Sequence, residues 1–576
     1  MVSKIDIRFL AVMMVVTLTA SGCAALRADL NTTVTVGSAG PSTTTTSPTT
    51  TTTTRDCSPL PFVPDPAATR IASLEPAEAS ISVSRAVFSC ADEVVVTAGD
   101  DLALVAVSAQ LAAALGGPLL VAGDGGPSRV EAELERLTPR TVYLVGAVPS
   151  LAVPIDATVE ALRGTPEDVA RVAYDALEAD TWVGLPSGGI AAAARILQPI
   201  ATGSSVWVPA SEPPGACDRD QEEITSAIDR RAQAAQPHGD LWLVDVCSPE
   251  LAMVAAVASR YAGGTVLLVD GRDLWRHRTL VDALPGASVP DRVVLLGEIA
   301  EDVEWQIGAL LSDKELPGGG LTLFPERRIV ALYGNPTTPA LGVMGEQGPE
   351  EAAERAREVA APYGADGIEI LPAFEIIATV ASASATEDGD YSWEMTVDEL
   401  RPWVQVAAEE GLYVTLDLQP GRTDFLTQAQ RYEQLLLLPH VGLALDPEWR
   451  LQPNQVHLRQ IGSVDAAEVN DVVDWLAGLV REHDLPQKLL ILHQFRFSMI
   501  TNRELIETPP ELAVLVHVDG QGPIHSKYET YGALTGASDA DRWWWGWKNF
   551  YDEDSPTPTP EQVLDLDPLP VYVSYQ

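Results

Sequence analysis

Short apolar segments alternate regularly with amphipathic helices in the second half of the chain, and this alternation constrains the fold more than any other feature. Strands are predicted at 329–333, 367–374, 412–418, 441–445, 488–492, 513–518, 542–547 and 571–575, with helices at 350–363, 396–410 and 466–483. Such alternation is typical of parallel α/β structure, and about 250 residues of it is the size of a (β/α)8 barrel. We therefore predict an α/β, TIM-like barrel over residues 326–576, without an eighth helix to close it.

The strand sequences also predict which side chains point into this barrel. Successive side chains of a strand point to opposite faces, and in three of these strands one face is entirely aliphatic. The aliphatic face must pack on the helices, so the mixed face points inward. Barrel active sites lie at the carboxyl ends of the strands. We expect a cluster there that contains Asp417, Asp446, His493, His517 and Asp519, with Glu448 directly after Asp446 and Glu375 just past the end of the second strand.

Several acids in one place favour a binding or catalytic site. Acids at strand ends also cap helices or pair with arginines, so each residue alone has a structural interpretation. Burying several carboxylates together, however, is costly unless protons, cations or a substrate compensate their charge. The convergence as a whole therefore indicates a ligand or catalytic site.

Aromatic side chains are expected beside the same mouth of the barrel. They are Trp449, Trp543, Trp544, Trp545, Trp547 and Tyr551, with Lys548, Asp552, Glu553 and Asp554 beside them. The residues expected to bind a substrate are Trp449, Trp543, Trp545, Trp547, Lys548 and Tyr551. The alternative is that this tryptophan run is simply an aromatic core strand. Aromatic faces next to carboxylates suit sugar rings, and in this general pattern the domain resembles glycoside-hydrolase-like barrels. No motif is similar enough to transfer a catalytic residue from them.

Glycoside hydrolysis needs one carboxyl as acid and a second as nucleophile or base. We assign Glu448 or Asp446 as the acid and Asp519 as its partner, a pair whose separation suits an inverting enzyme, whereas Asp417 and Asp446 lie on neighbouring strands and suit a retaining one. One alternative is a non-catalytic surface protein whose barrel binds a saccharide or peptide. Another is a metal-dependent hydrolase with Zn, Mn or Fe among the same histidines and aspartates. No other cofactor is predicted.

The region before the barrel contains one pattern three times. Each copy consists of a buried strand, a polar turn, a helix rich in small residues and a second buried strand, which together form a βαβ unit. The helices are expected at 102–115, 190–200 and 251–262. Continuous Val and Leu runs indicate parallel strands that are covered on both faces. We predict tandem Rossmann-like βαβ repeats, each with a parallel sheet, over residues 57–322, and a boundary at the loop Pro317-Gly318-Gly319-Gly320.

These copies are similar to a known family. In the first copy an Ala-rich helix is followed by a strand ending in Leu119-Leu120-Val121 and later by Val142-Tyr143-Leu144-Val145-Gly146. This arrangement resembles the cell wall-binding repeat 2 family, over about residues 67–311. The resemblance implies α/β units, commonly in threes, that hold secreted proteins to anionic wall polymers of Gram-positive bacteria. The alternative is a scaffold that keeps the fold without the ligand.

The first residues predict export and lipid anchoring. Lys4 and Arg8 form a short basic region, and an apolar run of about ten residues follows it. This run is too short to span a bilayer and suits a secretory signal. Ala20-Ser21-Gly22-Cys23 then resembles the bacterial lipobox, which implies cleavage before Cys23 and acylation of its thiol; the alternative is an ordinary signal peptide. We expect a signal at 1–23, a Thr-rich tether at 24–56, and a protein anchored at the outer face of the cytoplasmic membrane, in the cell wall.

The cysteine count predicts disulfides, and the net charge limits the kinds of partner that the chain can bind. After Cys23, the remaining four cysteines are Cys57, Cys90, Cys217 and Cys247, an even number that predicts two disulfides in an exported chain. Three pairings are possible, and we favour Cys57–Cys90 with Cys217–Cys247. Lys and Arg total 37 against 81 Asp and Glu, a formal net charge of −44. This charge argues against nucleic acid as a partner, because that binding relies on cationic contacts to phosphates.

Overall fold

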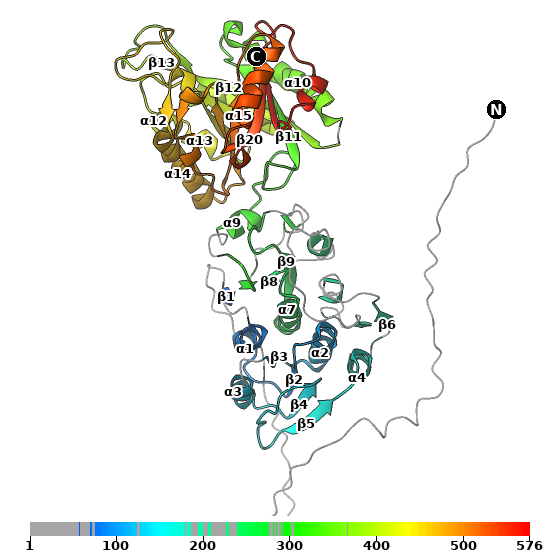
Figure 1. Ribbon diagram of the computed structural model, residues 1–576. Coiled ribbons are helices and arrows are strands. Elements are labelled where there is room, and N and C mark those ends of the chain that lie inside the picture. Colours follow the sequence, from blue (N-terminus) through cyan, green and yellow to red (C-terminus); the bar gives the residue numbers. More distant parts are fainter. Residues whose placement is uncertain are drawn as a thin grey trace, which may run out of the picture. The chain divides into compact units, whose positions relative to one another are not determined.

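A computed structural model of the chain describes residues 57, 69–71, 75–123, 127–177, 179, 181–185, 194–197, 200, 205–208, 226–229, 239–275, 280–281, 284, 290, 292–300, 305–365 and 367–576 (Figure 1). They form two compact units: one contains the described residues of 73–216 together with 249–262, and the other those of 217–248 and 263–576 together with 69–71. Cys23, Cys217, the signal and the Thr-rich tether lie outside the described residues. Within the described part, no helix has both the length and the apolar character needed to cross a bilayer.

The first unit contains a parallel sheet of four strands. The sheet has the order β3 (Leu119–Val121), β2 (Glu93–Thr97), β4 (Thr141–Val145) and β5 (Thr158–Leu162). A second parallel pair is formed by β6 (Thr181–Gly184) and β7 (Ser205–Val208). The helices are α1 (Pro76–Val87), α2 (Leu102–Leu115), α3 (Pro127–Leu137), α4 (Pro166–Leu177) and α7 (Pro249–Ala262).

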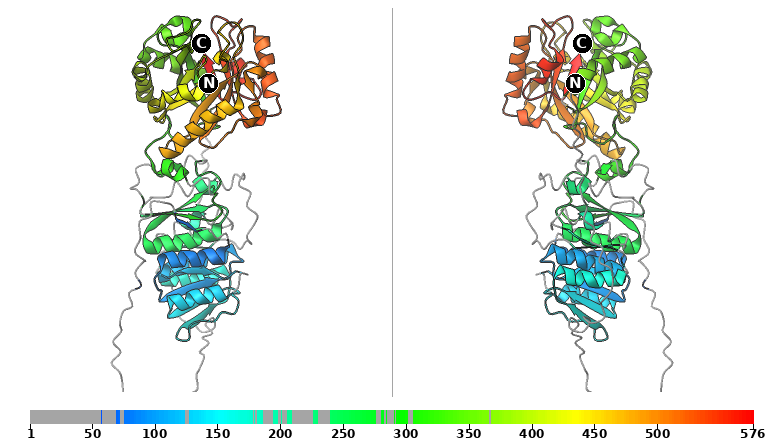
Figure 2. Two further views of the ribbon diagram at one scale, coloured as in Figure 1. Left: turned by 90° about the vertical axis from the view of Figure 1, so that its left-hand side faces the viewer. Right: turned by 90° about the vertical axis from the view of Figure 1, so that its right-hand side faces the viewer.

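Helix α2 shows why this unit packs tightly. Asp101 accepts a hydrogen bond from the Ala103 amide at its start, and Gly116 ends it in the left-handed conformation, with φ of 68°. Its small residues are buried almost throughout, so α4 and α7 both pack against it (Figure 2). The predicted disulfide Cys57–Cys90 is present, with the Cα atoms 5.1 Å apart, and Cys247 is also disulfide-bonded.

The second unit begins with another parallel sheet. Its order is β1 (Thr69–Ile71), β10 (Val293–Leu296), β8 (Asp240–Asp245) and β9 (Gly264–Val269), and α9 (Gln306–Leu311) follows it in the chain. The sheets before the barrel are thus parallel in the described residues, as the continuous apolar runs predicted. That these strands and helices belong to wall-binding repeats remains a prediction.

A closed barrel of eight parallel strands forms the rest of the second unit. In chain order the strands are β11 (Arg327–Gly334), β12 (Glu369–Ala381), β14 (Tyr413–Leu418), β15 (Val441–Leu445), β17 (Lys488–His493), β19 (Leu512–Val518), β20 (Trp544–Asn549) and β21 (Tyr572–Tyr575). Each pairs with the next, and β21 pairs with β11 to close the ring. The predicted barrel is confirmed, and every predicted strand overlaps an observed one.

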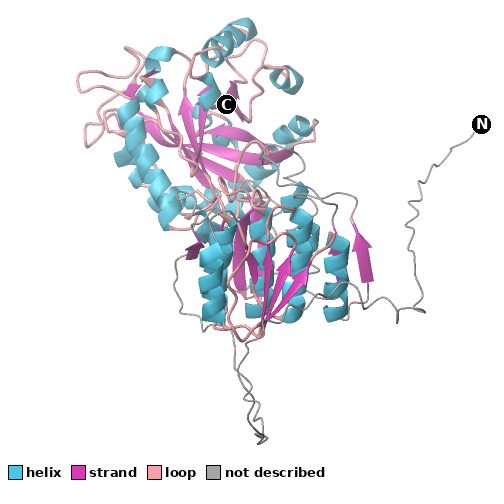
Figure 3. Cartoon of the chain, turned by 60° about the horizontal axis from the view of Figure 1, so that its bottom comes forward, coloured by secondary structure: helices cyan, strands magenta, loops and turns pink. Residues whose placement is uncertain are grey.

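Helices surround these strands (Figure 3). They are α10 (Pro349–Ala360), α11 (Val397–Glu410), α12 (Phe425–Gln430), α13 (Glu433–Leu436), α14 (Ala466–Glu482), α15 (Ile524–Thr535) and α16 (Pro560–Leu564). Local sequence sets their ends: Thr396 and Glu399 form a capping box at the start of α11, and Gly411 ends it with φ of 71°. Strand β12 continues past the barrel and pairs antiparallel with β13 (Ser392–Glu394).

The half of the barrel interior at the amino ends of the strands is apolar. Its buried cluster consists of Leu316, Leu323, Phe324, Ile329, Ala331, Leu371, Ala373, Tyr413, Ala444, Leu489, Ile491, Ala513, Leu515 and Tyr572. Phe324 and its neighbours precede β11 and cover this end of the barrel, where the Arg327 guanidinium donates to the Pro317 and Gly319 carbonyls at 2.9 and 2.7 Å. The inward faces deduced from strand alternation are therefore confirmed for β14, β15, β17 and β19.

Candidate active site

Polar side chains replace the apolar ones toward the carboxyl ends of the same strands. Two positions beyond Ala331, Ala373, Ile491 and Leu515 of the apolar cluster stand Tyr333, Glu375, His493 and His517, all of them buried. Asp417 and Asp446 continue the inward faces of β14 and β15, and Asp519 follows β19. The predicted convergence of Asp417, Asp446, His493, His517 and Asp519 is therefore present.

His493 lies at the centre of this cluster. Its Nδ1 is 3.0 Å from Asp519 Oδ2, and its Nε2 is 2.8 Å from Glu375 Oε1 and 3.8 Å from Asp417 Oδ1. Burial alone lowers the pKa of a histidine, but the carboxylates of Asp417, Asp519 and Glu375 outweigh it and hold the pKa of His493 well above its usual value. The cluster therefore contains an imidazolium among carboxylates.

Two tyrosines fix the carboxylates around His493. Tyr333 donates its hydroxyl to Asp417 Oδ2 at 2.8 Å, and Tyr572 donates to Glu375 Oε2 at 3.0 Å. Burial raises the pKa of Asp417 to about 6, against the lowering effect of His493. Neither tyrosine was predicted at the site, although the alternation along β11 and β21 points both side chains inward.

Lys548 reaches the same end of the barrel from β20. Its ammonium lies 3.2 Å from the centroid of the Tyr333 ring, a cation–π contact. The side chain is buried, and it lies at the end of the barrel where Lys548 was expected.

Asp446 and Glu448 come from the turn after β15. Asp446 Oδ1 accepts from the Glu448 amide at 3.1 Å and so caps the short helix Pro447–Trp449. Burial raises the pKa of Asp446 well above its usual value. Glu448 is only partly buried, and its burial, together with the charge of Asp519, raises its pKa to about 7. Glu448 is therefore a carboxyl that keeps a proton near neutral pH and has access to solvent.

Several buried polar atoms at this end have no hydrogen-bond partner among the described residues. They are Asp417 Oδ1, Asp519 Oδ1 and His517 Nδ1. The other ring nitrogen of His517 lies 2.7 Å from the Ser574 hydroxyl, and burial, with the positive charge of His493, holds the pKa of His517 well below its usual value. His517 is therefore neutral, and the open atoms are positions where a ligand would complete the hydrogen bonding.

The aromatic side chains expected at the mouth lie in different places. Trp449 directly follows Glu448, is partly exposed, and contacts His457 edge-to-face at 5.3 Å between ring centroids. Tyr551 follows β20, is 42% exposed and lies 5.4 Å from the Tyr575 ring. Trp449 is thus the tryptophan of the predicted set that directly follows one of the acids in the chain.

The other tryptophans are not at the mouth. Trp545 and Trp547, exposed by 5% and 0%, point outward and pack on Tyr531 of α15, with ring centroids 6.3 and 5.6 Å apart. Trp543 lies at the opposite end of β20, where its indole N–H donates to Asp539 at 3.2 Å. Alternation along β20 explains this result, because Trp544, Gly546 and Lys548 occupy the inward face; Trp544 packs on the apolar cluster.

The acids after β20 lie in the loop at the carboxyl end of that strand. Asp554 is buried and accepts from Lys527 Nζ of α15 at 2.7 Å and from the Phe550 amide at 2.9 Å, so it holds the loop after β20. Asp552 and Glu553 are exposed.

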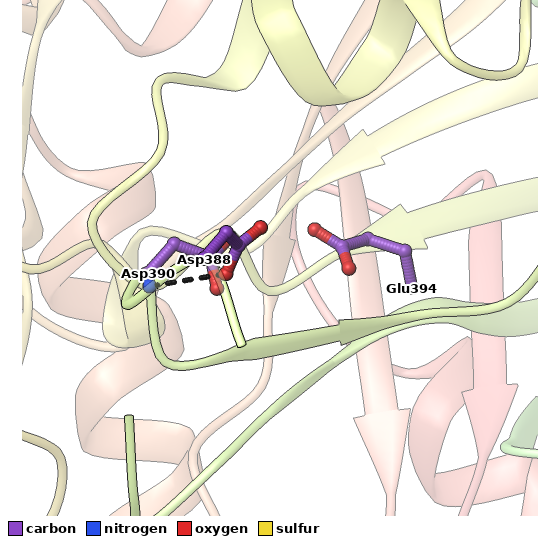
Figure 4. Close-up of side chains that lie close together, drawn as sticks. All are labelled: Asp388, Asp390 and Glu394. Carbon is purple, nitrogen blue, oxygen red and sulfur yellow. Dashed lines mark hydrogen bonds between the residues drawn. The ribbon is translucent and has the colours of Figure 1, made fainter. Parts of the chain in front are cut away.

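Three acids outside the barrel interior lie close enough together to suggest a cation. Among the described residues, the group whose candidate ligand atoms all lie within 4.8 Å of one another is Asp388, Asp390 and Glu394, at the β12–β13 hairpin (Figure 4). Asp390 accepts from Thr386, Ser392 and Thr423, and Glu394 lies 3.7 Å from Arg431. These internal partners explain the arrangement as a hydrogen-bonded turn. In the barrel, His493 has carboxylates at both nitrogens, so the predicted metal alternative would require those contacts to break.

The fold and the site together define a closed parallel α/β barrel with a buried acid–imidazole cluster at the carboxyl ends of its strands. No family model and no curated protein matches the chain. Among solved structures, it is similar to Cwp6 from Clostridium difficile, with 12% identity and a TM-score of 0.36 over 61% of this chain and 62% of that one. It is also similar to Cwp8 from Clostridium difficile, with 12% identity and a TM-score of 0.35 over 42% and 51%. The chain thus spans less than two thirds of either protein.

Proposed function

We propose that the barrel hydrolyses a saccharide of the cell envelope, with Glu448 as the general acid and Asp519 as its partner. The observation that carries the proposal is the environment of Glu448. It is a partly exposed carboxyl with a pKa raised to about 7, and Asp519 is the charged group that raises it most after burial. A general acid works best when its pKa is near the operating pH, and paired carboxyls with separated proton affinities are typical of glycoside hydrolysis.

Glu448 suits the role of acid better than Asp446. Asp446 is 3% exposed, and one of its oxygens already accepts from the Glu448 backbone. In the proposed reaction Glu448 donates its proton to the glycosidic oxygen as the bond to the sugar breaks. Asp519 accepts a proton from the water that attacks the anomeric carbon, which gives inversion. Trp449, next to Glu448, offers a ring face on which a sugar stacks.

The same proposal places the protein at the cell surface. Cys23 carries the lipid, the Thr-rich segment spaces the folded units from the membrane, and the α/β units within residues 67–311 contact an anionic wall polymer. These assignments rest on the lipobox-like sequence and on the resemblance to wall-binding repeats. Release of the protein from membranes by Cys23→Ser would test the anchor.

Substitution of the acids tests the enzyme. We expect Glu448→Gln and Asp519→Asn to reduce the release of reducing ends from purified wall glycans by about 100-fold or more, the usual contribution of general acid–base catalysis. Glu507→Gln is the matched control, because Glu507 is exposed in the loop before β19. Unchanged turnover in Glu448→Gln, Asp446→Asn and Asp519→Asn would refute the assignment. Binding of glycan without cleavage by the wild type would instead identify a surface binding protein.

A further inference from the structure

We propose that Glu375 and His493 are positioning residues that hold Asp519 as a fixed anion opposite Glu448. This inference rests on the proposed function. It adds Glu375, which lies on β12 and has no contact with the turn that carries Glu448 among the hydrogen bonds of the described residues. Glu375 acts through His493, and His493 acts on Asp519.

The contacts of the imidazole select its charged form. Carboxylate oxygens lie 3.0 Å from Nδ1 and 2.8 Å from Nε2, and the ring is fully buried. A neutral imidazole has one N–H, so one of these two contacts would bring two acceptors together. The imidazolium donates at both nitrogens, and each of these bonds is then charge-assisted.

Glu375 is itself fixed at both oxygens. Oε1 accepts from His493, and Oε2 accepts from Tyr572 at 3.0 Å. Asp519 is different, because Oδ2 accepts from His493 while Oδ1 has no hydrogen-bond partner among the described residues. The chain of contacts from Tyr572 to Asp519 therefore ends on one oxygen that is free to meet a substrate or water.

Charged and titratable groups face His493 from all sides of the barrel. The negative groups that favour the protonated form of His493 are Glu375, Asp417, Asp446, Glu448 and Asp519, whereas the positive charge of Lys548 disfavours it. The other groups around the ring are Tyr333, Tyr572 and the neutral His517. The His517 ring lies 5.2 Å from the His493 ring. Glu375 and Asp519 are the two that contact the ring nitrogens within hydrogen-bond distance, so loss of either should weaken the imidazolium most.

The ionisation of His493 can be measured without any assay of activity. We expect the 15N spectrum of the full-length protein, labelled at histidine and assigned with His493→Gln, to show both nitrogens of His493 protonated at pH 7. A neutral His493 at pH 7 in the wild type overturns the proposal. Because this measurement uses the wild type, it stands even if a variant fails to fold.

Kinetics test the role of Glu375. Glu375→Gln should move the acidic limb of the pH profile of kcat/KM upward by about 1 unit, since loss of a close charge partner weakens the imidazolium that contacts Asp519. Tyr572→Phe should move it in the same direction by less. Glu369→Gln, at the other end of β12, is the matched control. If His493 is protonated but the pH profile of Glu375→Gln does not move, the proposal is also overturned. If the wild type does not cleave glycan, the proposed function is refuted, and the 15N spectrum alone then tests whether His493 is an imidazolium between Glu375 and Asp519.

Discussion

The two halves of the barrel interior are built on the same eight strands but differ in chemistry. Leu489 and Ile491 of β17 belong to the apolar cluster, and His493, two positions further on, contacts two carboxylates. The apolar half gains stability from burial and packing. The polar half accumulates charge that burial disfavours, and such exceptions to apolar packing are expected at functional sites. The stability of the apolar half can therefore offset the cost of burying charge in the polar half. Because only the polar half carries these charges, the two halves should respond differently to pH.

Removing the imidazolium should have the largest effect. His493→Leu leaves Glu375 and Asp519 buried without their shared cation, and breaking such a pair costs about 3–5 kcal/mol. We expect this loss of unfolding free energy at pH 7 and a much smaller one at pH 4, because the raised pKa values of Asp417 and Asp446 leave the cluster with less negative charge there. Urea unfolding at the two pH values measures it, with Leu489→Ala as the apolar control. Equal losses at both pH values would show that the polar half is no more charged than the apolar one.

The pH dependence of stability should reveal Glu448. Its pKa in the folded protein is raised from 4.5 to about 7, so its contribution to stability is complete below about pH 4.5 and is lost as the pH rises through about 7. The total is at most about 3 kcal/mol. Glu448→Gln should therefore have a flatter stability curve than the wild type between pH 4.5 and 8. Part of the slope that remains should come from Asp417, Asp446 and His493, whose raised pKa values act in the same direction. A parallel pair of curves would contradict the partly buried position of Glu448.

Strand alternation made much of this site predictable. A period of two residues along β14, β17 and β19 is enough to point Asp417, His493 and His517 inward, and closure of the barrel brings them together. The same rule points Tyr333 and Tyr572 inward. Neither was predicted at the site, because the predicted cluster was chosen from acids and imidazoles and their two strands contain none. Glu375 was expected past the strand end; in fact β12 runs on to Ala381, because it still pairs with β11 and β14 at Glu375 and then with β13 from Thr379 onward.

The tryptophans show where sequence alone is insufficient. Strand β20 begins at Trp544 rather than 542, and four closely spaced indoles hide which face is apolar. Only the contacts with Tyr531 show that Trp545 and Trp547 face the helices. The hydrogen-bond partners of the acids are also out of reach of sequence, because they join residues as far apart as Glu375 and Tyr572.

The aromatic side chains offer a smaller effect that sharpens the same comparison. Trp449→Ala should raise KM for wall glycan by about tenfold with little change in kcat, since ring stacking contributes about 0.5–1.5 kcal/mol. Trp547→Phe should leave KM unchanged, because that ring faces α15. It should cost about 1 kcal/mol of stability through loss of the indole hydrogen bond to Asn549. Steady-state kinetics and thermal unfolding of both variants separate the two roles. If KM rose in Trp547→Phe and not in Trp449→Ala, the sugar would not stack on Trp449.

The smallest effect should come from the apolar half itself. Ile491→Val removes one methylene from a fully buried side chain directly below His493, and such changes cost about 0.5–1.5 kcal/mol. Because no charge is altered, the loss should be the same at pH 4 and pH 8, and the pH profile of kcat/KM should not move. Unfolding and kinetics at both pH values measure this. If Ile491→Val shifts the profile, then the packing beneath His493 sets the geometry of its two carboxylates, and the two halves of the barrel act as one.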